Sequence, residues 1–510
     1  TVSYHRFCYQ RHSVLPVLIS QEIMDYRFFV IFIFTIATVE CQNVANNTNA
    51  NNKDTTVDVE TTNLEKEIPK PKLSHLCVVC NCSDIIDCDN RNLTHYFEDE
   101  QWSNETIKIA SFKGNLLVHV KQFPKIEIRK LSLQKNEITK IDPRAFKEII
   151  NLTELDLSHN QLTTENLKPG VFEGKFSSDA YEPLEKLVVL NLAHNMLHSL
   201  HQDLFEHTES LKVLNLSWNL FSKIDERTSI AISSLPHLEE LDLSYCGLKT
   251  LSDVHFYSKL NLSGNLLTSA PKALEETTML EVLYLDENPI QIINYLYPFP
   301  LIPKLKELSL CCMPHLTIVG PYAFPGLTSL EHLRIQNCPK LESIDGYALA
   351  TKAPVWPPLK KLDLSDNALR YLPQQLVARW DWLEKLDLMN NKWSCDCNNQ
   401  YLIGTLLPKY GKRLMGDELD SLTCAFPPEH AGKNLSSLSH RNLRCLDLNN
   451  ARPERDAMIL IGVLVGLLLA IPVCLTIFVF WRRGFFFCGT QGPATFSRAF
   501  YTRATDDDEF

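Results

Sequence analysis

The sequence lacks the groups of residues that most enzymes and nucleic-acid-binding proteins need. It has no cluster of lysine and arginine and its net charge is −11, which disfavours binding to a polyanion. It also shows no Ser/His/Asp arrangement, phosphate-binding glycine loop or paired-carboxylate site. His194 and His198 have the spacing of a zinc-protease helix, but Asn195 stands where such a helix carries its glutamate. The sequence therefore predicts a protein that is not an enzyme and that holds no cofactor or metal.

The N-terminal region has no methionine over residues 1–23. The first methionine, Met24, is followed by a short apolar run, Phe28–Ala37. This run is too short to span a bilayer but suits the core of a signal peptide. We expect a signal peptide over residues 24–41 and an extension of gene-prediction origin over residues 1–23, with a genuine upstream extension as the alternative. Residues 42–76 are polar and almost free of aromatic side chains, which predicts a disordered spacer.

The C-terminal segment is too short for a kinase or another catalytic domain. After a charged stalk over residues 446–457, residues 458–480 form an uncharged apolar run. As a helix this run is about 34 Å long, enough to cross a hydrocarbon layer of about 30 Å. Trp481, Arg482, Arg483, Arg498 and Arg503 follow it, which places the tail of residues 481–510 in the cytoplasm. We expect a type I single-pass protein of the plasma membrane.

One motif, Leu-x-x-Leu-x-Leu-x-x-Asn, recurs twelve times over residues 107–391. In each Leu-x-Leu the two leucines share one face of a short strand, and asparagine can both donate and accept hydrogen bonds where the chain bends. Most copies are 19 to 29 residues apart, the period of a leucine-rich repeat. The copies end at Asn115, Asn136, Asn160, Asn195, Asn219, Cys246, Asn265, Asn288, Met313, Cys338, Asn367 and Asn391. The predicted fold is an α/β, right-handed leucine-rich repeat solenoid with a curved parallel sheet on its concave face.

Cysteines gather on both sides of the repeats. Four of them, Cys77, Cys80, Cys82 and Cys88, precede the first repeat within residues 77–106, and Cys395, Cys397, Cys424 and Cys445 follow the last within residues 392–445. The ends of a solenoid expose leucines and an unpaired strand edge, which must be covered. We expect disulfide-locked caps in an oxidising compartment, with Trp393 covering the C-terminal end; a zinc knuckle or an unrelated knot is the alternative at the N-terminal side.

The concave face is the expected ligand surface, because its outward side chains lie on a rigid scaffold. Its charges are mixed, which suits a protein partner. Candidate residues are Arg129, Lys130 and Gln134 in one early repeat and Glu154 and Asp156 in the next. The alternative is that these charged residues have no role in binding, because any sheet exposed to solvent carries similar charges. The insertion over residues 168–183 is rich in turn-forming residues and is expected to be a loop, with a role in binding or none.

Eight Asn-x-Ser/Thr sequons predict a glycoprotein. They lie at Asn46, Asn81, Asn92, Asn104, Asn151, Asn215, Asn261 and Asn434. Asn215 and Asn261 occupy the middle of Leu-x-Leu motifs, where a glycan would mask part of the concave face.

Three further features lie outside the motifs already described. Cys312 and Cys338 fall on adjacent coils, so they could form a disulfide, with buried structural thiols as the alternative. Gly462 and Gly466 lie four residues apart in the apolar run, a spacing found in helix dimers and also in ordinary membrane helices. Cys488, just beyond that run, is a candidate for palmitoylation or a plain unmodified thiol.

The two cysteine patterns resemble the caps of the extracellular leucine-rich repeat superfamily, which includes Slit, Toll and the Nogo receptor. The resemblance covers residues 77–445. It implies disulfides between Cys77 and Cys82, Cys80 and Cys88, Cys395 and Cys424, and Cys397 and Cys445. Toll is disfavoured because the tail lacks the cytoplasmic domain of that family.

Within the superfamily, the chain is most similar to the trophoblast glycoprotein family. The similar segments are LDLSHN with the insertion after it, NNKWSCDC, LTCAFP, one membrane helix and a short tail, although the chain ends in DDEF rather than in that family's PDZ ligand. The resemblance implies cell-surface adhesion and modulation of Wnt signalling. We expect an adhesion molecule, receptor or co-receptor; the alternative is an auxiliary subunit of a membrane channel or receptor complex.

Overall fold

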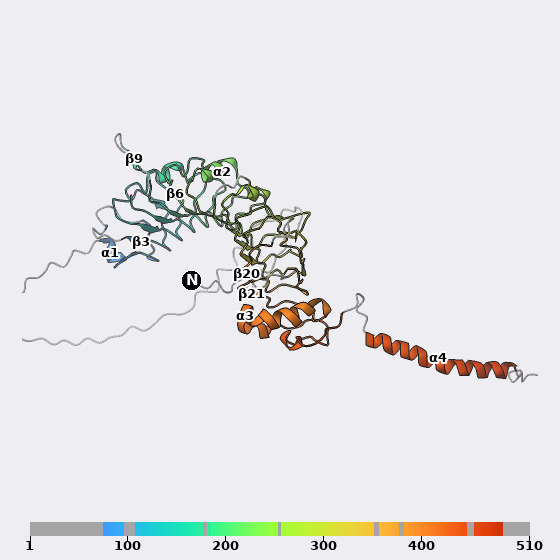
Figure 1. Cartoon of the computed structure of the whole chain (residues 1–510). Coiled ribbons are helices and arrows are strands. Elements are labelled where there is room, and N and C mark those ends of the chain that lie inside the picture. Colours follow the sequence, from blue (N-terminus) through green and yellow to red (C-terminus); the bar gives the residue numbers. More distant parts are fainter. Residues whose placement is uncertain are drawn as a thin grey trace, which may run out of the picture.

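The repeats form a parallel solenoid that curves into an arc (Figure 1). The computed structural model describes residues 75–95, 102, 108–176, 181–182, 184–252, 257–350, 356–376, 382–445 and 453–482. One fourteen-stranded sheet, in the order β1-β2-β3-β5-β7-β10-β11-β12-β13-β14-β16-β18-β20-β21, lines the inner side of the arc. Its first two strands belong to the N-terminal cap and the other twelve to the repeats. The predicted fold class is confirmed.

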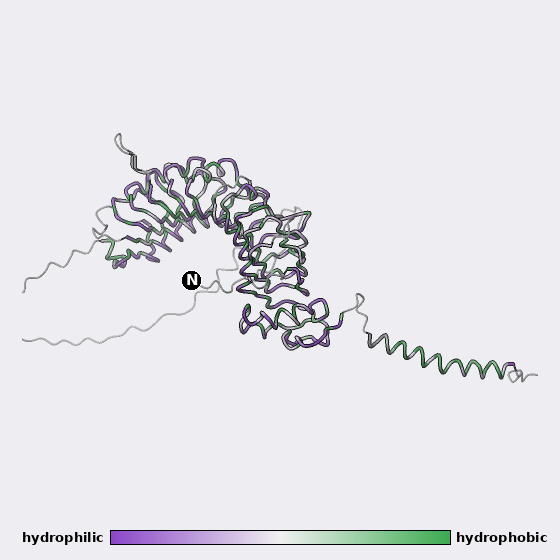
Figure 2. Tube along the Cα trace, viewed as in Figure 1, coloured by the Kyte–Doolittle hydropathy of each residue, from purple (hydrophilic) through white to green (hydrophobic). Residues whose placement is uncertain are grey.

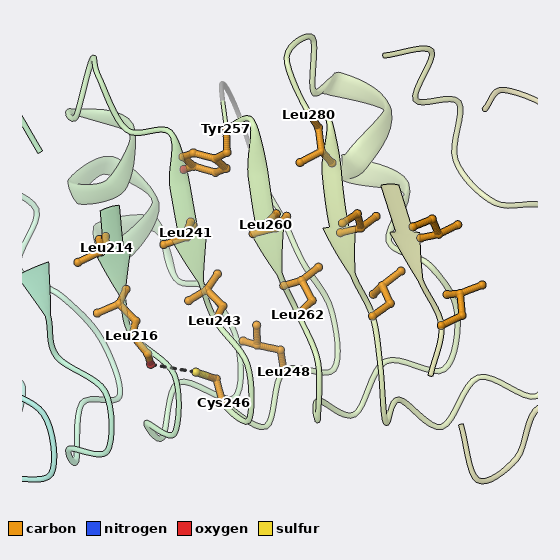
Figure 3. Packing of buried hydrophobic residues seen from close by; sticks show 14 of the residues in the cluster. Leu214, Leu216, Leu241, Leu243, Cys246, Leu248, Tyr257, Leu260, Leu262 and Leu280 are labelled. Carbon is orange, nitrogen blue, oxygen red and sulfur yellow. Dashed lines mark hydrogen bonds between the residues drawn. The ribbon is translucent and has the colours of Figure 1, made fainter. Parts of the chain in front are cut away.

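Each repeat strand has three residues, and strands of neighbouring repeats pair in register. They are β3 (Ile109–Ser111), β5 (Lys130–Ser132), β7 (Glu154–Asp156), β10 (Val189–Asn191), β11 (Val213–Asn215), β12 (Glu240–Asp242), β13 (Lys259–Asn261), β14 (Val282–Tyr284), β16 (Glu307–Ser309), β18 (His332–Arg334), β20 (Lys361–Asp363) and β21 (Lys385–Asp387). The central residue of each is buried and is leucine in all but β3, which has Ala110. Figure 3 shows such leucines, for example Leu214, Leu241 and Leu260, stacked in one layer.

A ladder of buried asparagines joins each coil to the one before it. Asn160 donates from Nδ2 to the carbonyl of Leu157 in its own coil (2.9 Å) and to that of Leu133 in the preceding coil (3.1 Å). Its Oδ1 accepts from the backbone N–H of Ile138 at 3.1 Å. One side chain thus satisfies three backbone groups that the bend would otherwise leave unpaired. The same pattern recurs at Asn136, Asn195, Asn219, Asn265, Asn288, Asn367 and Asn391.

Cysteines replace asparagine in two rungs of the ladder. The thiol of Cys246 donates to the carbonyl of Leu216 at 3.3 Å (Figure 3), and that of Cys338 donates to Leu310 at 3.4 Å. Of the two alternatives for Cys312 and Cys338, the structure has no disulfide between them, and Cys338 is a buried thiol. The ladder position directs the Cys338 side chain inward, whereas the Cys312 sulfur lies 3.7 Å from that of Cys311.

The outer side of the arc carries short strands and helical turns. They are β4 (His119–Val120) and β6 (Lys140–Ile141), which pair, the three-stranded sheet of β15 (Ile292–Ile293), β17 (Ile318–Val319) and β19 (Ser343–Ile344), and the helices η2 (Pro169–Phe172), α2 (Glu226–Ser233) and η3 (Lys272–Glu276). Inside them, the rings of Phe123, Phe146, Phe172 and Phe205 stack at centroid distances of 5.9, 6.4 and 6.5 Å. This stack fills the space behind the leucine layer.

The insertion differs from the expected loop. Its first part is η2, in which Val171 and Phe172 are buried, and its described remainder includes an antiparallel pair, β8 (Lys175–Phe176) with β9 (Tyr181–Glu182). The loop expectation over residues 168–183 was therefore wrong at its start. The reason is that Phe172 continues the phenylalanine stack, so the chain stays in the solenoid up to that residue.

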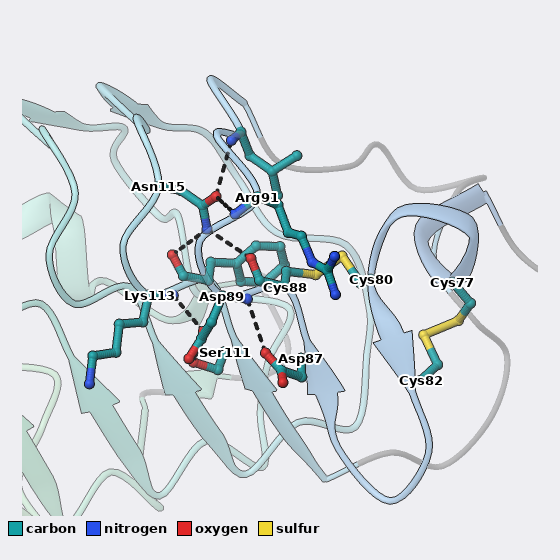
Figure 4. Close-up of a disulfide and its surroundings, with 12 residues drawn as sticks. Cys77, Cys80, Cys82, Asp87, Cys88, Asp89, Arg91, Ser111, Lys113 and Asn115 are labelled. Atoms are coloured by element: carbon teal, nitrogen blue, oxygen red, sulfur yellow. Dashed lines mark hydrogen bonds between the residues drawn. A yellow bond between two sulfur atoms is a disulfide. The ribbon is translucent and has the colours of Figure 1, made fainter.

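Disulfide-bonded caps close both ends. The N-terminal cap contains α1 (His75–Val79), β1 (Asn81–Cys82) and β2 (Ile86–Asp87), with disulfides between Cys77 and Cys82 and between Cys80 and Cys88 (Figure 4). The C-terminal cap contains η4 (Cys397–Asn399), the π-helix η5 (Leu402–Gly411), α3 (Lys412–Met415), η6 (Gly416–Ser421) and η7 (Ser436–Leu438), with disulfides between Cys395 and Cys424 and between Cys397 and Cys445. These are the four pairs that the resemblance implies. Trp393 is fully buried and donates to the carbonyl of Leu388 at 3.1 Å, beneath this cap.

A single long helix, α4 (Pro453–Arg482), follows the C-terminal cap. Residues 457–482 are long and apolar enough to cross a membrane. Figure 2 shows hydrophobic residues along nearly all of α4, whereas each coil of the solenoid alternates between hydrophilic and hydrophobic stretches. Cys488, Asn46, Asn104 and the proposed signal peptide lie outside the described residues.

Replacing Asn160 with alanine should lower the free energy of unfolding by about 3 kcal/mol, because three buried backbone groups lose their partner. Urea unfolding of the fragment of residues 77–445 measures the change. Gln161→Ala, at the exposed neighbouring position, is the matched control and should change it by less than about 0.5 kcal/mol. Equal effects of the two substitutions would contradict the role given to the ladder.

Candidate functional site

The concave sheet presents two rows of outward side chains. Each strand contributes one residue to each row: the residue before its buried central residue belongs to the first row, and the residue after it belongs to the second. The first row reads Ile109, Lys130, Glu154, Val189, Val213, Glu240, Lys259, Val282, Glu307, His332, Lys361 and Lys385; the second reads Ser111, Ser132, Asp156, Asn191, Asn215, Asp242, Asn261, Tyr284, Ser309, Arg334, Asp363 and Asp387. The second row carries no cation before Arg334.

Most second-row Asp and Asn residues also shape the end of their strand. The Oδ1 atoms of Asp156, Asn191, Asn215, Asp242 and Asn261 each accept from the backbone N–H two residues further on, at 2.9 to 3.1 Å. This contact fixes the turn after the strand. One oxygen of each aspartate is therefore structural, and the other can face the hollow of the arc.

The N-terminal end of the concave face is hollowed. A cavity of about 690 Å³ lies over the N-terminal cap and the strands β3, β5, β7 and β10. Side chains of Ile85, Ile109 and Val189 contribute apolar lining. Carboxylates of Asp84, Asp87, Asp89, Glu154 and Asp156 line the same cavity, with Lys130 as the cation among them. The hollow thus combines an apolar floor with an acidic edge.

Three of the five candidate ligand residues line this hollow. Lys130 and Glu154 form an ion pair of 2.6 Å across adjacent strands, and Asp156 lies beside them. Arg129 precedes β5 and is exposed, and Gln134 follows that strand in the loop. Neither lines the cavity, because side chains that flank a strand leave the sheet at a different angle from those within it.

Sequence reasoning missed the acidic residues of the cap. Asp89 accepts from the hydroxyl of Ser111 (2.5 Å) and from the backbone N–H of Lys113 (2.9 Å), which attaches the cap to the first repeat (Figure 4). Asp87 accepts from the backbone N–H of Asp89 at 3.0 Å. The available signal was the run of aspartates between and after the cysteines, at Asp84, Asp87 and Asp89. Their place beside Glu154 follows only from β2 pairing with β3.

The C-terminal half of the concave face is more evenly charged. A second cavity, of about 270 Å³, is lined by Glu307, His332, Arg334, Lys361, Asp363, Lys385 and Asp387. Burial raises the pKa of Asp387. Burial and the Glu307 carboxylate raise the pKa of Tyr284 to about 12, so its hydroxyl stays protonated and donates to Glu307 at 3.2 Å.

Ion pairs between coils balance most other charges along the face. The pairs are Lys212 with Glu239, Lys259 with Glu240, Lys306 with Glu281 and Lys360 with Glu331, at 2.6 to 2.9 Å. Their side chains are 31 to 56% exposed, so each pair contributes little to stability. The acidic edge of the N-terminal hollow differs because, among its lining residues, only Lys130 offsets it.

Two sequons lie on the concave face, as the motif predicts. Asn215 and Asn261 are second-row residues, and Asn261 also donates from Nδ2 to Asp242 at 3.0 Å. Asn81, Asn92 and Asn434 are exposed, and Asn151 accepts from Lys186 at 2.6 Å. A glycan on Asn261 would replace one of the two Nδ2 hydrogens, which leaves a single N–H for the hydrogen bond to Asp242.

A row of stacked rings runs along the rim of the sheet. His159, His194, Trp218 and Tyr245 each precede a ladder position and have φ between 52° and 56°. Their ring centroids are 3.9, 5.0 and 4.2 Å apart. Burial, and then the charge of Lys135, lowers the pKa of His159; burial, and then His159, lowers the pKa of His194. Both imidazoles are therefore neutral at pH 7.

Comparison with known proteins agrees with this architecture. Residues 126–174 and 185–248 match the family model described as "Leucine rich repeat". Together with the solenoid of parallel strands, this match shows that the chain contains leucine-rich repeats.

The chain is similar to several curated leucine-rich repeat proteins. It is 25% identical over 365 residues to podocan of Mus musculus (62% of this chain, 57% of podocan) and 29% identical over 245 residues to tsukushi of Gallus gallus (47% and 61%). Trophoblast glycoprotein of Macaca fascicularis is 28% identical over 242 residues (44% and 52%). These matches span roughly half the length of each relative.

Two solved structures match the chain, each with a low TM-score. One is a chain of the octameric complex of latrophilin 3, Unc5D and FLRT2, with a TM-score of 0.39 and 20% identity, covering 72% of this chain and 99% of that one. The other is a chain of the LRIM1/APL1C complex, with a TM-score of 0.39 and 25% identity, covering 57% and 54%.

Asn215→Gln should shift the electrophoretic mobility of the fragment of residues 77–445, produced in the secretory pathway, by one glycan, because the Asn215 Nδ2 makes no competing bond within the described part of the chain. Asn261→Gln should shift it less, since the Asn261 Nδ2 is engaged by Asp242. Deglycosylated samples of each variant are the control. If neither substitution shifts the mobility, glycans do not mask the concave face.

Acidification should weaken the fold through the His159–His194 stack. Folding lowers the pKa of both imidazoles, so below about pH 6.5 the unfolded chain binds more protons than the folded chain. The stacked neutral rings therefore contribute their full stability above that pH. This contribution to the free energy of unfolding is lost as the pH falls further. The double variant His159→Gln/His194→Gln should therefore lose less melting temperature than the wild type between pH 7 and pH 5. Substituting the exposed His237 with Gln serves as the control and should leave the wild-type pH dependence unchanged.

Proposed function

We propose that residues 77–445 are the ectodomain of a type I cell-surface glycoprotein, and that it binds a protein partner through the N-terminal part of its concave face. The single observation that carries this proposal is the 690 Å³ hollow with an apolar floor and an acidic edge. Three-residue strands locked by the asparagine ladder hold its side chains in place, so little conformational entropy is lost on binding. A protein segment with exposed lysine or arginine and apolar side chains fits this lining.

The finer assignments are part of the same proposal. An adhesion molecule, receptor or co-receptor at the plasma membrane suits a capped solenoid followed by α4, and modulation of Wnt-type signalling is suggested by similarity to trophoblast glycoprotein alone. Glycans on Asn215 and Asn261 would direct ligands away from the middle of the sheet, toward its N-terminal strands, whereas a glycan on Asn81 would lie within the lining of the hollow itself. Palmitoylation of Cys488 and pairing of α4 helices through Gly462 and Gly466 would act on the membrane side.

A second candidate function is an auxiliary subunit of a channel or receptor complex in the same membrane. It is favoured by the small residues Gly462 and Gly466 along α4, because a Cβ added at either would meet no atom within 4 Å beyond the backbone of its own helix. In that case the partner contacts would be made chiefly by α4.

The soluble fragment of residues 77–445 should bind a protein on other cells or in their medium, and Asp84→Lys should weaken that binding at least tenfold. Asp84 is exposed and lines the hollow, so reversing its charge opposes a basic ligand. Glu206→Lys makes the same charge change at an exposed turn outside the hollow and should have no effect. Capture of partners by the full chain but not by the fragment would instead favour the auxiliary role.

A further inference from the structure

Three tyrosines form a column on the outer side of the solenoid. Tyr297, Tyr322 and Tyr347 follow one another at intervals of 25 residues and are 65, 45 and 49% exposed. The backbone fixes their register, because Tyr322 donates its N–H to the carbonyl of Tyr347 (3.1 Å) and Phe299 donates to Ala323 (2.8 Å). The three side chains therefore occupy equivalent positions on successive coils.

Exposed apolar residues surround this column. Ile292 and Ile318 pair across β15 and β17, and both are exposed. Tyr295 and Leu296 lie at the tip of a tight turn in which Asn294 and Tyr297 exchange backbone hydrogen bonds. We call the patch of Ile292, Tyr295, Leu296, Tyr297, Leu301, Ile318, Tyr322 and Tyr347 the tyrosine face.

The solenoid itself does not require tyrosine at the column position. In earlier coils the equivalent residue, two positions before the buried ring or leucine, is Arg144, Asp203 or Lys272. The sequence also has no sequon between Asn261 and Asn434, so no N-linked glycan is attached to the coils that carry the tyrosine face. Contiguous exposed apolar surface of this kind marks an interaction site, and tyrosine is enriched in such sites.

The area and symmetry of the face fit a second copy of this chain. Its eight side chains are between 38 and 65% exposed, and with about 150–250 Å² for a large side chain they offer roughly 800 Å². That is the area one partner contributes to a stable interface. The three tyrosines lie at the same register on three successive coils, so a two-fold axis through the middle one can place each of them against a tyrosine of the second copy. All eight side chains are uncharged, so two copies can meet without burying like charges.

We infer that the ectodomain forms a two-fold homodimer through the tyrosine face. Tyr322 lies near the axis and faces the same tyrosine of the second copy, while Tyr297 faces Tyr347 of the second copy. This contact leaves the concave face of each copy open.

Cysteine substitution in the full chain, produced in cultured cells, tests this geometry. Tyr322→Cys should give a disulfide-linked dimer on a non-reducing gel above the wild-type background, because the two sulfurs meet at the axis. Cells that make both Tyr297→Cys and Tyr347→Cys chains should give crosslinked pairs that neither chain gives alone. Leu220→Cys, at an apolar position in the N-terminal half that is more exposed than Tyr322 (61% against 45%), should stay at background.

Loss of association is the second measurement. Tyr322→Arg should weaken dimerisation of the detergent-solubilised chain at least tenfold by light scattering, because two arginines would face each other. The measurement uses a Gly462→Ile/Gly466→Ile background, which removes any pairing of α4 helices, and Leu220→Arg is the control. Unchanged secretion and circular dichroism establish that the variants fold. A monomeric parent chain, an unaffected Tyr322→Arg variant, or use of the face by a different protein would each overturn the inference.

Discussion

The structure depends on one constraint: every coil must bend back to start the next one without leaving its backbone polar groups unpaired. Asparagine meets this constraint because its amide is short, donates twice and accepts at the same time. Asn160 illustrates the arrangement, since it joins two carbonyls and one N–H from two coils. Once the bend is fixed, the strand that follows has no freedom of register, and the central leucines must stack. The curved sheet is the sum of these local solutions.

The caps meet the same requirement at the two ends of the solenoid, where backbone polar groups would otherwise be left unpaired. The N-terminal cap is more than a cover, because Cys88 donates its backbone N–H to Ser111 and Asn115 donates to the carbonyl of Cys88, so the cap acts as an additional coil. It brings its own aspartates onto the concave face beside residues of the third repeat strand, β7. The N-terminal hollow and the stability of that end of the solenoid thus depend on the same residues.

The sequence predicted the features that repeat and failed on those that arise between repeats. The spacing of leucine and asparagine was enough for the solenoid, for the placement of Asn215 and Asn261, and for the concave position of Lys130, Glu154 and Asp156. It could not show that the cap aspartates meet Glu154, because that depends on how β2 pairs with β3. Nor could composition reveal that Phe172 belongs to the core, since the turn-forming residues beside it dominate the local pattern. The sequence also left open whether Cys338 forms a disulfide or is a buried thiol, because only the ladder position in the folded chain sets the direction of its side chain.

The substitutions in the ladder divide the arc into stretches of unequal stiffness. The first five rungs, from Asn115 to Asn219, are all asparagine, whereas Cys246, Met313 and Cys338 stand in the sixth, ninth and tenth. A thiol donates only one proton, and a thioether donates none. Neighbouring coils are therefore held together less firmly at these rungs, two of which adjoin the coils that carry Tyr297 and Tyr322. Tension applied along the solenoid would separate coils there first, while the N-terminal hollow kept its shape. A molecule under tension would therefore lose the contact through its tyrosine face before a contact in the hollow of its concave face.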